Sequence, residues 1–68
     1  MESAYASWFG QSVVLHVATG DLRVPMRGTI VGETDTALRF RIAENWDIDI
    51  FKTMVLAVEE DSLAKVIS

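Results

Sequence analysis

The chain has 68 residues, of which 50% are hydrophobic, and its formal net charge is −4. A domain of this size buries only about 60% of the surface that its unfolded chain exposes, so it commonly needs a disulfide, a metal or a partner chain for stability. The sequence has no cysteine and one histidine, which excludes disulfides, thiolate metal sites and multi-histidine sites. Association with other chains is the remaining source of stability, and we expect a homo-oligomer or a complex with another protein.

The acidic balance also lowers the expectation of nucleic-acid binding, because modules of that kind usually have a basic surface. No apolar run approaches the roughly 20 residues of a membrane-spanning helix, and no basic and apolar leader resembles a signal peptide. We therefore expect a cytoplasmic protein without membrane contact. No linker, repeat or low-complexity segment divides residues 1–68, so we predict one small domain.

Both ends of the chain have the spacing of a short helix. Tyr5, Trp8 and Phe9 lie at positions i, i+3 and i+4, which predicts an N-terminal helix over 2–9. The last residues repeat this spacing behind an aspartate and a serine, both good N-cap residues, and predict a C-terminal helix over 61–67.

Between the two ends, the hydrophobic pattern has the period of two that is typical of β-strands. Gly20-Asp21 separates the first two alternating runs and predicts a two-residue hairpin turn. This turn predicts three inward-facing pairs: Val17 with Val24, Leu15 with Met26, and Val13 with Gly28. Gly28 has no side chain to fill the core, so we expect a sharp bend or the close approach of another backbone there.

The third and fourth runs predict a second hairpin with a three-residue loop at 43–45, in which Asn45 takes the left-handed conformation. The inner pairs are then Ile42 with Trp46, Phe40 with Ile48, and Leu38 with Ile50. The outer pairs are Arg41 with Asp47 and Arg39 with Asp49. Opposite charges directly across a ladder contribute about 0.2–1 kcal/mol per pair. The two aspartates are therefore interpreted as partners of the arginines rather than as metal ligands.

A fifth run follows the short break at 51–53, with Met54, Leu56 and Val58 facing inward. Five short antiparallel strands with one apolar face predict an all-β fold that curls so that this face closes on itself. The break suits the single-turn link of Src-homology-3-type barrels.

The stretch GTIVGETDTALRF, residues 28–40, is similar to the first motif of the Sm-like family, with its glycine, acid and spaced hydrophobic residues. The layout of a helix followed by five strands also resembles this family. The resemblance implies a five-stranded antiparallel SH3-like barrel over 11–59, assembly into rings or pairs, and single-stranded RNA binding. Residues 52–55 lack the Arg-Gly or Lys-His type of pair that closes the RNA pocket of the family.

Two surfaces are candidate interaction sites. Arg27, Arg39 and Arg41 share the outer parity and, with Trp8, could contact an anion or a nucleic acid. The alternative is that the arginines are already paired with carboxylates. Apolar residues on the outer parity form the candidate self-association surface, namely Val14, Val31, Phe51, Val55 and Ala57. Either the C-terminal helix or another subunit could cover part of it.

His16 is the single histidine and lies in mid-strand, with Pro25 as its expected neighbour and without an evident acid or nucleophile. We therefore expect no catalytic site, metal or cofactor. The function predicted first is a non-enzymatic, self-associating interaction module, and the alternative is an Sm-like single-stranded RNA-binding protein.

Overall fold

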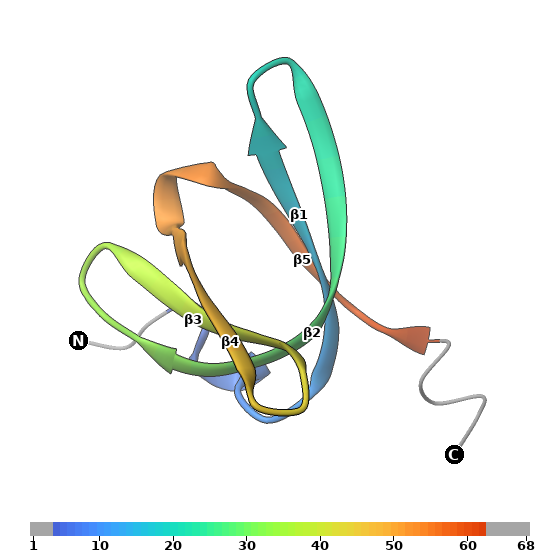
Figure 1. Cartoon of the computed structure of the whole chain (residues 1–68), viewed down its shortest axis with the longest axis vertical. Helices are drawn as coiled ribbons and strands as arrows, with labels where there is room; N and C mark the ends of the chain where they lie inside the picture. The colour runs from blue at the N-terminus through green and yellow to red at the C-terminus, as the bar shows by residue number, and fades with distance from the viewer. Residues whose placement is uncertain (1–3, 63–68) are drawn as a thin grey trace.

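The computed structural model of the chain describes residues 4–62, which form five strands and two single-turn 3₁₀ helices (Figure 1). In chain order the elements are η1 (Ala6–Trp8), β1 (Ser12–Thr19), β2 (Leu22–Glu33), β3 (Ala37–Ala43), β4 (Trp46–Phe51), η2 (Lys52–Met54) and β5 (Val55–Glu60). No helix in this part of the chain is long and apolar enough to cross a membrane. The predicted all-β class with five antiparallel strands is confirmed.

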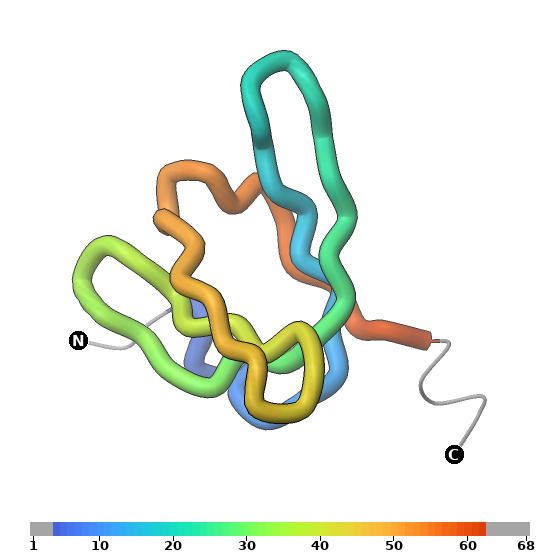
Figure 2. The backbone as a smooth tube through the Cα atoms, viewed as in Figure 1, coloured from blue at the N-terminus to red at the C-terminus, as the bar shows by residue number. Residues whose placement is uncertain are grey.

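The strands form one antiparallel sheet in the order β4-β3-β2-β1-β5. The sheet bends strongly around its inner face, as the backbone trace in Figure 2 shows. β4 and β5 lie at the two ends of the hydrogen-bonded order and do not pair with each other. The sheet is therefore open, and the predicted closed barrel over 11–59 is not confirmed.

The core lies on the inner face of this bend. Its buried members follow a period of two along each strand, and they are Val13, Leu15, Val17, Ile30, Leu38, Phe40 and Ile50. In β1, Val14 on the opposite face is buried as well. Burying an aliphatic or aromatic side chain of this size contributes about 1.5–3 kcal/mol. These seven residues are therefore the main apolar source of the stability of the sheet.

The first hairpin has the predicted register. Val17 pairs with Val24, Leu15 with Met26, and Val13 with Gly28. Gly20 in the turn has a φ of +63°, a value that glycine adopts without a steric penalty. Gly28 lies where β2 approaches β3: a Cβ atom there would lie 2.9 and 3.0 Å from two ring atoms of Phe40 and would overlap the carbonyl oxygen of Arg41. The close approach predicted at Gly28 is confirmed.

The second hairpin differs from the prediction at its end. Asn45 is left-handed as predicted, with a φ of +62°. Trp46 pairs with Ala43 rather than with Ile42, because the register shifts by one residue between Arg41 and Ala43. The loop therefore has two residues. Trp46 is 59% exposed, so its predicted place among the inner pairs is wrong.

β5 also departs from strict alternation. Val55 pairs with Val17, whereas Ala57 pairs with His16, so one extra residue lies between them. Such an insertion reverses the faces of the residues before it, since side chains alternate along a strand. Val55 consequently packs against the core, while Leu56 is 53% exposed. The predicted inward position of Leu56 and outward position of Val55 are wrong.

The described part of the predicted helix over 2–9 contains only the single turn η1. Phe9 already has the extended conformation, and Gly10 follows with a φ of +79°, so the helix ends after one turn. Tyr5 and Trp8 nevertheless pack against the core. Most of the helix predicted over 61–67 lies outside the described residues.

Candidate functional site

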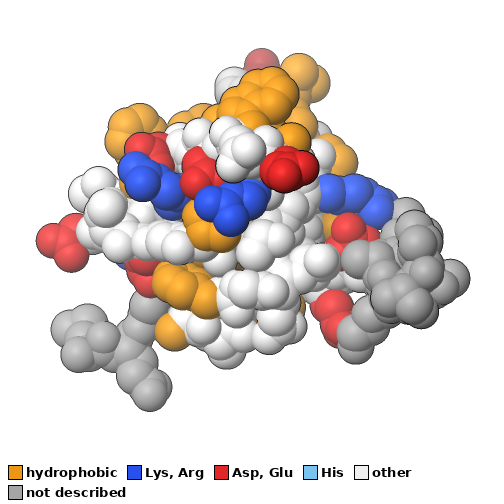
Figure 3. Space-filling view, turned by 60° about the horizontal axis from the view of Figure 1, so that its bottom comes forward, with side chains coloured by type: hydrophobic (Ala, Val, Ile, Leu, Met, Phe, Trp, Pro, Cys, Tyr) orange, Lys and Arg blue, Asp and Glu red, His pale blue; other side chains and the backbone are white. Residues whose placement is uncertain are grey.

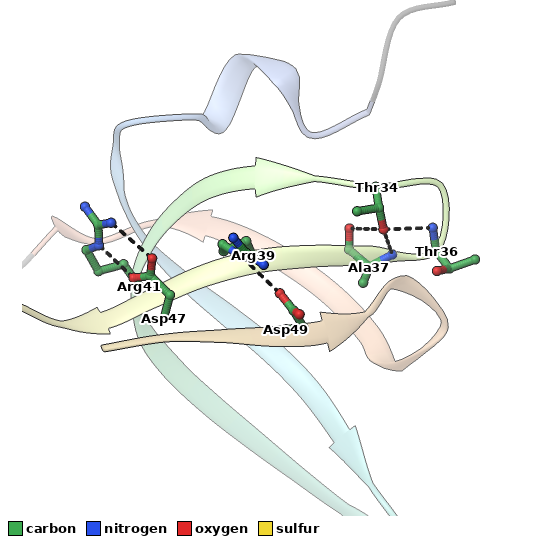
Figure 4. Close-up of polar contacts among 7 residues, drawn as sticks. All are labelled: Thr34, Thr36, Ala37, Arg39, Arg41, Asp47 and Asp49. Atoms are coloured by element: carbon green, nitrogen blue, oxygen red, sulfur yellow. Dashed lines mark hydrogen bonds and ion pairs between the residues drawn. The ribbon is translucent and has the colours of Figure 1, made fainter. Parts of the chain in front are cut away.

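The outer face of β3 and β4 is occupied by the two cross-strand ion pairs that the sequence predicts (Figure 4). Arg41 Nε donates to Asp47 Oδ1 at 2.7 Å, and its Nη2 donates to Asp47 Oδ2 at 3.1 Å. This two-bond contact lowers the pKa of Asp47 from its ordinary value and raises the pKa of Arg41, chiefly through the hydrogen bonds. The guanidinium of Arg41 is thus already engaged by a carboxylate.

The second pair is looser than the first. Arg39 Nε donates to Asp49 Oδ1 at 3.3 Å, and the contact does not use the terminal nitrogens of Arg39. The two side chains are 60% and 63% exposed. A carboxylate can accept two parallel hydrogen bonds from a guanidinium, but this exposed pair forms only one. Both Arg39 and Asp49 can therefore still interact with a further charged group.

Arg27 does not extend this row of charges. Its Nη1 donates to Asp61 Oδ1 at 3.1 Å, across the other end of the sheet. The Asp61 side chain is almost buried, and its backbone N–H donates to the Ser12 carbonyl at 3.0 Å. Each of the three predicted ligand arginines therefore has its own carboxylate. Asp61 was missed because it is 34 residues from Arg27, and only the β1–β5 pairing brings the two together.

A pocket of about 360 Å³ lies beside the looser ion pair, where β2 turns into β3. Its lining is contributed by three strands and the turn between two of them: Val31, Gly32, Glu33, Thr34, Ala37, Arg39 and Asp49. We call this the outer-face pocket. The register of β2 shifts between Ile30 and Gly32, and this bulge leaves Val31 exposed at the pocket. No pattern in the sequence predicts it, because a bulge has no counterpart in simple alternation.

Hydrogen bonds and an ion pair hold the rim of the pocket. The Thr34 hydroxyl accepts the N–H of Ala37 at 3.1 Å and that of Thr36 at 3.4 Å, which secures the turn (Figure 4). Glu33 is paired with Lys52 of η2. The pocket therefore has a supported frame, and its lining combines apolar residues with the Arg39–Asp49 pair.

The predicted apolar surface is only partly present. Val31 and Phe51 are exposed, on β2 and β4. Val14 is only 7% exposed and Val55 packs against the core, so neither of them belongs to an exposed patch. Ala57 is half-buried opposite His16. Figure 3 shows that hydrophobic side chains lie above and below a band of adjoining basic and acidic side chains on one face.

The remaining candidates have contacts within the sheet. Trp8 is half-buried and packs against the core. His16 Nε2 lies 3.3 Å from Glu59 Oε1, an acid that sequence reasoning missed because it lies on β5. Within residues 4–62, no three side chains of the metal-binding types gather into one group.

Comparisons with protein-family models, with curated proteins and with solved structures found no match to this chain. The functional interpretation therefore rests on the residues and the geometry described above.

Proposed function

We propose that this chain is a non-enzymatic, SH3-like and Sm-like small-barrel interaction module that self-associates. One observation carries the proposal: within residues 4–62, each of the two edge strands has a strand neighbour on one side only, and each presents at least one large exposed apolar side chain. These are Trp46 and Phe51 on β4 and Leu56 on β5. The expected cytoplasmic location stays a prediction.

The physical reason is the hydrogen-bonding capacity of an edge. An unpaired strand presents a row of backbone N–H and C=O groups that another strand can complete. Pairing β4 of one copy with β5 of the next would satisfy both rows. It would also bury the apolar side chains that these strands expose, at about 25 cal/mol per Å² of surface removed from water.

Single-stranded RNA binding is the less favoured function. Arg27, Arg39 and Arg41 all have carboxylate partners, and Trp8 packs against the core. A titration with single-stranded RNA at low salt separates the two functions, since phosphate contacts are strongest there. Tight, salt-sensitive binding would favour the RNA function, and its absence is the expected result.

Hydrogen exchange at two protein concentrations tests the edge contact. The backbone N–H groups along the open edges of β4 and β5 should exchange more slowly in the concentrated sample, because an added strand supplies carbonyl acceptors for them. The amides at 13–17 of β1 and 38–41 of β3, where the strands have a paired neighbour on each side, serve as the internal control. Unchanged exchange at both edges in a sample that has associated would place the contact elsewhere.

A further inference from the structure

The β1–β2 hairpin ends in an exposed apolar side chain that the edge contact does not use. Figure 1 shows this hairpin projecting beyond the rest of the sheet. We call residues 19–24 the hairpin tip. Leu22 in the tip is 69% exposed, more than any other large apolar side chain in the described part of the chain. A second chain that covered this side chain would remove its apolar surface from water, which is favourable by about 25 cal/mol per Å².

Charged residues adjoin Leu22 in the sequence and add a polar feature to the hairpin tip. Asp21 precedes Leu22 in the turn, and Arg23 follows it on β2 with its side chain on the opposite face of the strand. Among the large apolar residues exposed in residues 4–62, Leu22 is the only one with an acid on one side and a base on the other. Neither Asp21 nor Arg23 makes an ion pair within this part of the structure.

The outer-face pocket has the complementary arrangement. Val31, Gly32 and Ala37 supply apolar surface, and Arg39 and Asp49 carry one positive and one negative charge in its lining. The single 3.3 Å contact between Arg39 and Asp49 leaves both groups accessible, unlike the two-bond contact between Arg41 and Asp47 nearby. An apolar side chain that directly follows a turn carboxylate therefore finds apolar surface and an accessible guanidinium here.

A chain cannot fill its own pocket with its own tip. The hairpin tip and the β2–β3 turn lie at different corners of the molecule (Figure 1). Contact between them requires two copies, and it joins different surfaces of the two. Such a heterologous contact leaves a free tip on one copy and a free pocket on the other, so it continues into a ring or a filament.

We propose that Leu22 of one copy inserts into the outer-face pocket of a second copy, with Asp21 of the turn against Arg39. This inference rests on the proposed self-association and names the two surfaces that meet. It adds a side-chain lock, which gives direction and specificity, to the less selective backbone contact of strand edges.

Sedimentation of purified variants tests the contact. Leu22→Ser removes the apolar anchor from a position that is exposed in the single chain, so the fold is retained. We expect the dissociation constant of self-association to rise about tenfold or more. Leu22→Met keeps an apolar side chain of similar size and should retain association. Phe9→Ser removes an exposed apolar side chain outside both surfaces and should leave association unchanged.

The pocket is tested by filling it. Gly32→Val adds a branched side chain at a residue that lines the pocket, where the first added carbon would lie 3.5 Å from Arg39 Cβ, an ordinary contact. Val31→Lys replaces an exposed residue of the same lining with a longer, charged one, and it is used in place of Gly32→Val if circular dichroism shows that the latter is unfolded. Either folded variant should weaken association about as much as Leu22→Ser.

Mixing gives the sharpest result. Leu22→Ser keeps an intact pocket, and the pocket variant keeps an intact tip, so the mixture has one working contact per pair. We expect the mixture to associate more strongly than either variant alone at the same total concentration, because one tip-to-pocket contact per pair is restored.

The outcomes separate this inference from the proposed function. If the wild type associates and Leu22→Ser associates equally well, the tip-to-pocket contact is wrong while self-association stands. If the pocket variants weaken association and Leu22→Ser does not, another side chain of the second copy enters the pocket and the pairing is overturned. A wild type that stays a single chain at every concentration overturns both.

Discussion

Gly28→Ala is the substitution whose effect the structure specifies most closely. The added methyl group would overlap the carbonyl oxygen of Arg41 and lie within 3.0 Å of the Phe40 ring. The ring could turn aside, but the carbonyl belongs to the backbone of the neighbouring strand. Relief therefore requires β2 and β3 to separate at the point where they frame the core.

The expected loss of stability follows from this geometry. Adding a methylene group to a packed core typically costs about 1–3 kcal/mol, and a backbone obstruction lies at or above the upper end of this range. We expect a loss of at least about 3 kcal/mol. A domain of 68 residues has a total unfolding free energy of roughly 3–10 kcal/mol, so this single change removes a large part of it.

Urea unfolding, followed by circular dichroism and by tryptophan fluorescence, measures the effect. With a slope of about 1.5 kcal/mol per molar urea, the midpoint should fall by about 2 M. Gly32→Ala is the matched control in the same strand, because its methyl group meets only Arg39 Cβ at 3.5 Å. It should stay within about 0.5 kcal/mol of the wild type. Equal stability of the two variants, measured at one protein concentration, would refute the close approach of β2 and β3.

Three further changes test the charged contacts. Exchanging Arg39 and Asp49 together should restore most of the stability that either single substitution removes. A double-mutant cycle should give a coupling energy near the lower end of the range of about 0.2–1 kcal/mol. A double exchange whose effect equals the sum of the two single effects would contradict the pairing. Because Arg41 lowers the pKa of Asp47, this carboxylate stabilises the folded state above its ordinary pKa of 3.8, and the contribution is lost as the pH falls through the lower folded value. Asp47→Asn should therefore flatten the acid limb of the stability profile below about pH 4, and an unchanged limb would count against this pair. Asp61→Asn should cost about 1–2 kcal/mol in urea unfolding, since it weakens a bond from Arg27 to a nearly buried carboxylate, and a neutral result would show that the contact adds no stability.

The sequence predicts those parts of the fold in which a turn and an alternating pattern agree. Gly20-Asp21 and the flanking alternation specify the register of the first hairpin, and Gly28 marks the close approach of two strands. The Arg39–Asp49 and Arg41–Asp47 pairs follow from the same rule, because residues opposite each other on one face share a parity.

Single-residue bulges account for the errors of placement. Trp46 and Leu56 each lie beside a register shift, where one extra residue reverses the expected face. The sequence does not predict the outer-face pocket for the same reason, since the pocket adjoins the bulge at Val31. The hydrogen bond between Arg27 and Asp61 is not predicted for a different reason. It depends on which strands become neighbours, and local spacing does not encode that.

The mass of the wild-type chain in solution tests self-association most directly. Light scattering from low to high micromolar concentration, at moderate salt, should show a weight-average mass that rises above that of one chain. The weight-average mass of the Leu22→Ser variant, measured in parallel, should begin to rise only at a higher concentration than that of the wild type. A mass that stays at one chain over the whole range would contradict the proposed function.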